Sequence, residues 1–417
     1  MTSKRKLARG VAVVGAGITR FGVYPKNVAS ADLFVSAFLD LKDAADKGFD
    51  DRDIDALYLG NLSSELFEGT AHIAADVMSR LGLTPRPAVR VENACASSGV
   101  AFREGVIAIA SGMCDVVLVG GVEKMTNLDT TSVTGVLSLA LDPALELASG
   151  ETFPGIFATI ATAHMAKYGT SPEDLMRVAI KNHNNASLNP KAHLKSTIKD
   201  IMKKRASACA EKGLSVPGWR DEMEFLGDLE QNPYVAYPLR LFDCSTVCDG
   251  ASCVLLIAED RAREFTDKPI YVAGLGQASD DPLGERSDLT SMRSVREAAR
   301  QAYEMAGATP KDIKLAEVHD CFTIAEVLAM EDLGFYPPGE AVRAIKNGET
   351  ELTGRLPINS DGGLKAKGHP IGATGTGMVV ELFKQMRGEA GARQIKGRDL
   401  DLGLMLNIGA HGGNGGG

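Results

Sequence analysis

The sequence predicts an α/β protein made of two copies of one α/β domain, with an additional inserted segment. Stretches of the two halves match at a constant offset: VAVVGAG (11–17) aligns with IYVAGLG (270–276), and DDRDIDALYLGN (50–61) aligns with TPKDIKLAEVHD (309–320). Between the paired stretches, each half has apolar or alanine residues at helical spacing. Each unit is therefore expected to run strand, helix, strand. The stretch from about 124 to 250 has no counterpart in the second half.

The order of elements sets the domain boundaries. The apolar run that begins at Val11 predicts a strand, and residues 31–48 predict a helix that ends near a glycine. The runs 114–123 and 400–412 resemble each other, since both are apolar and end in glycines. We place the N-terminal half at 1–123, an inserted binding or lid domain at 124–250, a return to the N-terminal half at 251–265, and the C-terminal half at 266–417.

Composition excludes several classes of function. The chain has 417 residues, 44% hydrophobic and 24% charged, as expected for a soluble globular protein. One tryptophan and a net charge of −9 argue against a nucleic-acid binder. There is no run of about eighteen apolar residues, and the N-terminal apolar run is too short and glycine-broken for a signal peptide. The seven cysteines have neither disulfide-framework nor zinc-site spacing, so we expect reduced cysteines and a cytoplasmic location.

Cys95 is a candidate nucleophile. The stretch VRVENACASSGVAFREGVIAIASG (89–112) predicts a strand, a tight turn of small residues and a helix. Cys95 lies in the turn, where the N–H groups of the helix point. These groups favour the thiolate and are expected to lower the thiol pKa from about 8.5. A buried structural cysteine is the alternative reading.

A glycine-rich loop carries a second candidate. In DGGLKAKGHPIGATGTG (361–377), Gly368 and Pro370 hold His369 in an irregular turn before a predicted helix. The many glycines allow a ligand to approach the backbone closely. His369 is therefore a candidate catalytic residue, although a lone histidine is more often structural.

The pentapeptide VHDCF (318–322) places a histidine and a cysteine two residues apart. The pair could be half of a metal site, a nucleophile beside its base, or core packing. Residues two apart on a strand share a face, so His319 and Cys321 would project into one pocket while Asp320 points away. A metal would need another ligand, for which His411 is a candidate. We favour a proton-transfer site and expect no metal.

Together, NACASSG, HDCF and GGLKAKGHPIGATG resemble the motifs of the thiolases, over essentially the whole chain. Thiolases interconvert a 3-ketoacyl-CoA plus CoA with an acyl-CoA plus acetyl-CoA. The resemblance implies a five-layered α-β-α-β-α fold with a CoA-binding loop domain. It also implies an acyl-enzyme at Cys95, with His369 taking the Cys95 proton. CoA and acyl-CoA would be substrates, and no permanently bound cofactor is implied.

Two departures point to one branch of this family. HDCF stands where better-known thiolases have NEAF, and Asn407 stands where they have the second reactive cysteine, in a CIGGG motif. Both departures resemble the sterol-carrier-protein-x and archaeal thiolases, which are acetyl-CoA acetyltransferase-like.

The resemblance to this branch assigns further roles. Cys321 would be the acid/base that moves a proton at the acetyl α-carbon. His319, together with His369, would bind the thioester oxygen. The backbone N–H groups of Cys95 and Gly409 would form the other oxyanion site.

The CoA site is expected in the inserted segment. Residues 191–205 hold six basic residues against the single acid Asp200, and could meet the nucleotide phosphates; a solvated helix face is the alternative. Ser245 aligns with a family serine near the pantetheine. Met125 and the stretch 151–169 are expected to line the acyl pocket, and His164 could be structural or substrate-facing.

Two other functions stay open. A decarboxylating ketoacyl synthase also uses a Cys–His–His set, but it lacks the HDCF cysteine. A non-catalytic thiolase-like scaffold subunit is the other. We expect a homodimer or a dimer of dimers, and some relatives of this branch work with a small zinc-containing OB-fold partner. The chain ends at HGGNGGG, where the family usually continues into one more strand. The identity of the ketoacyl-CoA and the direction of reaction stay open.

Overall fold

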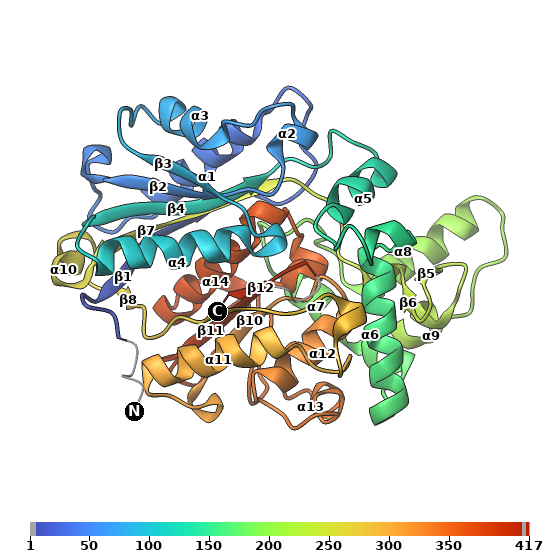
Figure 1. Ribbon diagram of the computed structural model, residues 1–417. Coiled ribbons are helices and arrows are strands. Elements are labelled where there is room, and N and C mark those ends of the chain that lie inside the picture. The colour runs from blue at the N-terminus through green and yellow to red at the C-terminus, as the bar shows by residue number, and fades with distance from the viewer. Residues whose placement is uncertain (1–5, 411–413, 417) are drawn as a thin grey trace.

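Five layers stack in the order helix, sheet, helix, sheet, helix (Figure 1). The computed structural model describes residues 6–410 and 414–416. The first sheet has the strand order β3-β2-β4-β7-β1-β8. Its strands are β1 (Val11–Ile18), β2 (Ala56–Gly60), β3 (Ala88–Val91), β4 (Val116–Glu123), β7 (Gly250–Ala258) and β8 (Ile270–Tyr271). Strands β2, β3 and β4 are parallel, whereas β7 is antiparallel to both β1 and β4.

The second sheet repeats the pattern of the first. Its order is β10-β11-β12-β9. The strands are β9 (Gln277–Ser279), β10 (Leu315–Val318), β11 (Gly403–Gly409) and β12 (Asn414–Gly416). β10 and β11 are parallel, as β2 and β4 are, and β12 is antiparallel to β11 as β7 is to β4. This correspondence confirms the duplicated fold expected from the sequence match.

Helices fill the three remaining layers. The central layer contains α4 (Ser97–Ala110) and α14 (Thr374–Arg387), which pack on each other between the two sheets (Figure 1). The outer layers contain α1 (Ser30–Asp43) and α3 (Ile73–Arg80) on one side, and α11 (Arg293–Ala306) and α12 (Thr323–Asp332) on the other. The central helices are buried almost all round because protein covers both faces.

Two glycines explain how closely the outer helices approach the sheets. A Cβ on Gly17 would overlap the carbonyl oxygen of Ala37 in α1, and a Cβ on Gly276 would overlap that of Ala298 in α11. Gly17 and Gly276 are equivalent positions of the two halves. Both halves therefore use a glycine to let helix backbone touch strand backbone.

The chain leaves the first sheet after β4 and returns at β7. The intervening segment lies beside the layered body (Figure 1) and has a small core of Met176, Ile198, Phe225 and Leu226. Its elements are α5 (Thr130–Ser138), α6 (Phe153–Tyr168), α7 (Pro172–Ser187), α8 (Ile198–Glu211), α9 (Glu222–Gly227), β5 (Tyr234–Ala236) and β6 (Leu239–Arg240). Helix α7 starts with a capping box in which Ser171 and Asp174 bond each other's backbone.

Three short helices complete the described chain: α2 (Ser64–Phe67), α10 (Ala262–Phe265) and α13 (Ala341–Lys346). Within residues 6–410 and 414–416, none of the helices combines the length and apolarity needed to cross a bilayer.

Candidate active site

Cys95 lies in the turn between β3 and the central helix α4. Strand β3 ends at Val91, a single 3₁₀ turn covers Ala94–Ala96, and α4 follows. Ser97 fixes the turn, because its hydroxyl donates to the Ala94 carbonyl (2.6 Å) and accepts from the Asn93 N–H (2.9 Å). Ala94 adopts a positive φ of 45°, a strained conformation for a residue with a Cβ. The predicted strand, turn and helix are confirmed.

The electrostatic expectation for Cys95 was wrong. Burial raises the pKa of the Cys95 thiol to about 12, although the backbone N–H groups of Ala410 and of Cys95 itself act in the opposite direction. The residue as a whole is partly exposed, but it packs against an apolar cluster that contains Met125, Val133 and Ile371. The free energy needed to remove water from around a thiolate is larger than the stabilisation that two backbone N–H donors provide. The resting thiol is therefore neutral.

The loop before α14 gives His369 one free nitrogen. Its backbone N–H donates to Cys248 Sγ (3.1 Å), and its Nδ1 lies 2.6 Å from Thr374 Oγ1. The Thr374 hydroxyl donates its single proton to the Pro370 carbonyl (3.0 Å). His369 Nδ1 must therefore carry a proton and donate it to Thr374, which leaves a lone pair on Nε2. That Nε2 has no hydrogen-bond partner among the described residues.

His319 has the opposite tautomer. Its Nδ1 faces two donors, the backbone N–H of Ile408 (3.3 Å) and the side-chain amide of Asn407 (3.2 Å). Because Nδ1 accepts, the proton of the neutral ring is on Nε2, where the described chain supplies no partner. Asn407 also donates to the Cys95 carbonyl (2.9 Å). His319 therefore offers a donor where His369 offers a lone pair.

Both rings are neutral and meet at one place. Burial lowers the pKa of His369 to about 3, and burial with the nearby His369 lowers the pKa of His319 well below its usual value. The rings lie edge to face with centroids 5.2 Å apart. Cys95 Sγ and one nitrogen of each ring lie within 4.8 Å of one another. The fold thus unites three residues that are 50 to 274 positions apart in sequence.

The same three atoms are close enough to surround a metal ion. They are a neutral thiol and two neutral imidazoles, and one imidazole presents a proton, not a lone pair. The absence of a metal stays a prediction. The other residue considered as a ligand, His411, lies outside the described residues.

Cys321 lies beside this cluster, in a loop and not in a strand. Strand β10 ends at Val318, so the two-residue strand period does not place His319 and Cys321; the connection to α12 does. Burial, followed by the proximity of Cys95, raises the pKa of Cys321 well above its usual value. Its carbonyl accepts from the Ser245 N–H (2.8 Å), which brings the predicted pantetheine residue next to it.

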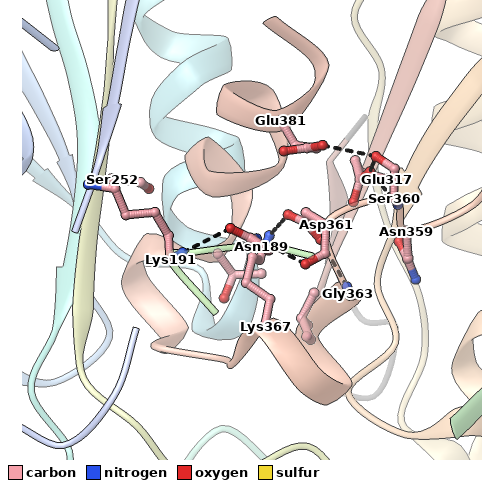
Figure 2. Close-up of polar contacts among 12 residues, drawn as sticks. Asn189, Lys191, Ser252, Glu317, Asn359, Ser360, Asp361, Gly363, Lys367 and Glu381 are labelled. Carbon is pink, nitrogen blue, oxygen red and sulfur yellow. Dashed lines mark hydrogen bonds and ion pairs between the residues drawn. The ribbon is translucent and has the colours of Figure 1, made fainter. Parts of the chain in front are cut away.

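A network of buried polar side chains surrounds and includes the segment 359–367, which leads to His369 (Figure 2). The Ser360 hydroxyl lies between two carboxyl groups, 2.7 Å from Glu317 on β10 and 3.1 Å from Glu381 on α14. Lys367 forms a buried ion pair with Asp361. Because these groups are buried and paired, they fix the loop relative to both the second sheet and the central layer.

The other predicted residues have the following places. Gly409 ends β11 and pairs with Asn414. The next residue, Ala410, supplies the backbone N–H that bonds the Cys95 sulfur. The oxyanion role of Gly409 stays a prediction. Both nitrogens of His164 are engaged, by Thr170 (2.8 Å) and Glu331 (3.1 Å), so this histidine is structural.

One basic residue of the expected CoA site is already engaged, since Lys191 pairs with Asp40 (2.7 Å). Sequence reasoning missed Thr374 and Cys248, which hold His369. The hydroxyl five residues after the loop histidine was the available signal for Thr374. Cys248 gave no local signal, because it reaches His369 from a distant strand end.

Comparison with known proteins agrees with this architecture. The family described as "Thiolase, N-terminal domain" matches residues 11–260, and "Thiolase C-terminal domain-like" matches residues 276–414. The chain is 43% identical, over 97% of each chain, to acetyl-CoA acetyltransferase of Methanothermobacter thermautotrophicus. It is 30% identical to sterol carrier protein 2 of Gallus gallus, over 97% of this chain and 70% of that protein. A solved structure described as "Ltp2-ChsH2(DUF35) aldolase" matches with a TM-score of 0.76 and 24% identity, over 98% of this chain and 97% of that one.

Proposed function

The chain belongs to the thiolase family, and on that premise we propose that it cleaves a 3-ketoacyl-CoA with CoA to an acyl-CoA and acetyl-CoA, or runs the reverse condensation, through an acyl group on Cys95. The observation that carries this proposal is the convergence of Cys95 with His319 and His369 within 4.8 Å. A neutral thiol, a lone pair and an N–H donor at one place are what acyl transfer to sulfur requires.

The first half of the reaction forms the acyl-enzyme. The Cys95 sulfur attacks the 3-keto carbon while His369 Nε2 takes the thiol proton. Because both groups favour their neutral forms, proton transfer accompanies attack and does not precede it. The oxyanion of the adduct accepts from backbone N–H groups, those of Cys95 and Gly409 in our proposal. Collapse of the adduct breaks the bond between C2 and C3 and leaves the acyl group on Cys95.

The leaving carbon fragment is the enolate of acetyl-CoA. Its oxygen accepts from His319 Nε2–H and from His369, which now carries the Cys95 proton. Cys321 donates its proton to the α-carbon, as a neutral buried thiol can, and acetyl-CoA is formed. The resulting Cys321 thiolate takes the proton of the incoming CoA thiol. The CoA sulfur then attacks the acyl carbon, and Cys95 leaves with the proton held by His369.

The surroundings of Cys95 indicate the class of acyl group. On one side, Cys95 packs against a cluster of apolar side chains that includes Met125, Val133, Val136 and Val247. An apolar acyl group loses no hydrogen bonds in such a pocket, whereas a carboxylate would be buried without a partner. We therefore propose an acetyl or other apolar acyl group.

The setting of the enzyme is also part of the proposal. We propose a cytoplasmic homodimer or dimer of dimers without a permanently bound cofactor. The basic residues of 191–205 and Ser245 would hold CoA. A separate partner subunit is supported by the similar structure whose description joins Ltp2 to ChsH2(DUF35).

Intact-protein mass spectrometry tests the proposal. The protein is incubated with a panel of acetyl-, butyryl- and benzoyl-CoA, and the modified peptide is sequenced. We expect one acyl group on Cys95 with at least one thioester, and none in Cys95→Ser. An unmodified Cys95 with every thioester would contradict acyl-enzyme chemistry and would favour a scaffold subunit.

A further inference from the structure

Asp320 connects the two loops that carry the reactive residues. It stands between His319 and Cys321, and its carboxylate is fully buried. One oxygen accepts from the backbone N–H of Leu364 (2.6 Å), and the other accepts from the backbone N–H of Lys365 (3.2 Å). Both donors belong to a single π-helical turn, Gly363–Lys367, which leads directly into the His369 loop. A single side chain thus holds the HDCF loop against the loop of the other catalytic histidine.

The turn is shaped around this carboxylate. Gly363, labelled in Figure 2, has a positive φ of 60°, and a Cβ on it would overlap the Asp320 carboxylate oxygens. Only glycine lets the backbone approach an acidic side chain so closely in this conformation. The turn and Asp320 therefore form one unit.

A second carboxylate shares a donor with Asp320. The amide of Asn182 on α7 donates to Asp320 (2.7 Å) and to Glu326 on α12 (2.8 Å). Glu326 also accepts from Asn359 (2.8 Å) and pairs with Lys181 (2.8 Å). All these side chains are buried.

Three charged groups therefore face Asp320 from the elements packed against it: Glu326 on α12, Lys181 on α7 and Lys365 in the turn. Asp320 itself makes no ion pair with any described residue, so its ionisation depends on the balance among these neighbours.

We propose that Asp320 is a positioning residue that, in its ionised form, aligns His319 and Cys321 with His369 and Cys95. Three N–H donors converge on Asp320, and an ionised carboxylate accepts from all of them. A protonated carboxyl would turn an O–H toward these donors and release the turn. The kinetic test of this inference, which measures kcat, rests on the proposed thiolase function. The second test, which measures amide hydrogen exchange, rests on the structure alone.

The charge of Asp320 is expected to change near neutral pH. Burial, and next the charge of Glu326, raise the pKa of Asp320 to about 7. A raised carboxyl pKa means that the ionised form appears only as pH rises through about 7. Catalytic activity should therefore rise with pH in this range. Glu123 also has a pKa of about 7, because of burial, and accepts from the Gly372 N–H (3.0 Å), so the test must separate the two.

The test compares Asp320→Asn with a matched variant in the full-length chain. In Asp320→Asn, the side-chain amide places its own N–H groups opposite the N–H donors that Asp320 accepts from. We therefore expect kcat for acetoacetyl-CoA thiolysis to fall about 10- to 100-fold while KM changes little. The control is Asp332→Asn, a half-buried carboxylate at the far end of α12 that accepts from Ser291 (2.5 Å) and Met292 (2.6 Å). It should keep kcat within about twofold, as expected for a site without contact to the reactive groups.

Glu326→Gln distinguishes Asp320 from Glu123, the two carboxyl groups with a pKa of about 7. It removes the charge that raises the Asp320 pKa, so the acid limb of kcat should move to lower pH. An unchanged limb in Glu326→Gln would assign that limb to Glu123 and overturn the inference. Wild-type kcat and pH profile in Asp320→Asn would also overturn it.

Amide hydrogen exchange gives a readout that needs neither activity nor a variant. In the wild type, protection of Leu364 and Lys365, corrected for intrinsic exchange, should fall as pH drops through about 7. Protection that is constant from pH 5.5 to 8.5 would refute the role of Asp320 even if thiolase activity is found. Absence of thiolysis together with pH-dependent protection would instead refute the proposed function and keep the positioning role.

Discussion

Replacing His369 by Asn separates two descriptions of the Cys95–His369 pair. In one description the resting pair is already ionised, and in the other both groups are neutral. The structure favours the neutral pair, because burial raises the pKa of Cys95 to about 12 and lowers that of His369 to about 3. His369 would then act only during acyl transfer.

The magnitudes follow from the thiolate fraction and from general-base catalysis. A thiol with a pKa of about 12 has roughly three-thousandfold less thiolate at pH 7 than a free cysteine with a pKa of about 8.5. Alkylation of Cys95 by iodoacetamide should therefore be slow at pH 7 and rise about tenfold per pH unit toward pH 11. His369→Asn should leave alkylation nearly unchanged, since the thiolate does not depend on the base. It should slow acylation by acetyl-CoA about 10²- to 10⁴-fold, since the attacking thiol then loses its proton acceptor.

Both rates can be followed by mass spectrometry of Cys95. His183→Asn is a matched control, because His183 is also buried with a pKa of about 3, and its Nδ1 bonds the Ser196 carbonyl (3.0 Å). This control should change neither rate. Fast alkylation at pH 7 that is lost in His369→Asn would refute the neutral pair.

Two further predictions address the second thiol and the fold. Cys321→Ala should abolish thiolysis and condensation, which need a proton transfer at the α-carbon. Acylation of Cys95 by acetyl-CoA, measured by mass spectrometry, should be slowed but retained, because Cys321 only assists the departure of CoA; unchanged turnover would favour a decarboxylating synthase. Gly276→Ala should lower the thermal unfolding temperature, because the new Cβ would overlap the Ala298 carbonyl, at a cost of about 1–3 kcal/mol. Gly218→Ala, where nothing lies within 4 Å of the new Cβ, is the control, and equal shifts would count against backbone contact as the cause.

The duplicated fold could be predicted because its signals are local and occur twice. Strand runs such as 11–17 and 270–276, and the helical spacing that follows each, need no knowledge of distant contacts. The glycines of these runs also recur, and Gly17 and Gly276 make the same close approach to a helix. The candidate residues Cys95 and His369 were found because each lies in a short run of small residues or glycines.

The protonation of Cys95 and the placement of His319 and Cys321 could not be predicted from the sequence. A helix N-terminus predicts a lowered pKa for Cys95, yet the pKa is raised, because side chains from distant segments of the chain exclude water. The strand period predicted a shared face for His319 and Cys321, but the strand ends at Val318. Their positions depend instead on the connection between β10 and α12.

The sequence by itself determined the elements, the duplication and the candidates for the reactive residues, because these depend on neighbours within a few positions. Only the tertiary structure decided their chemistry. The tautomer of His369 depends on Thr374. The tautomer of His319 depends on the backbone N–H of Ile408, which belongs to strand β11. Protonation depends on how much water the whole fold removes from each group, and that quantity exists only once distant segments pack together.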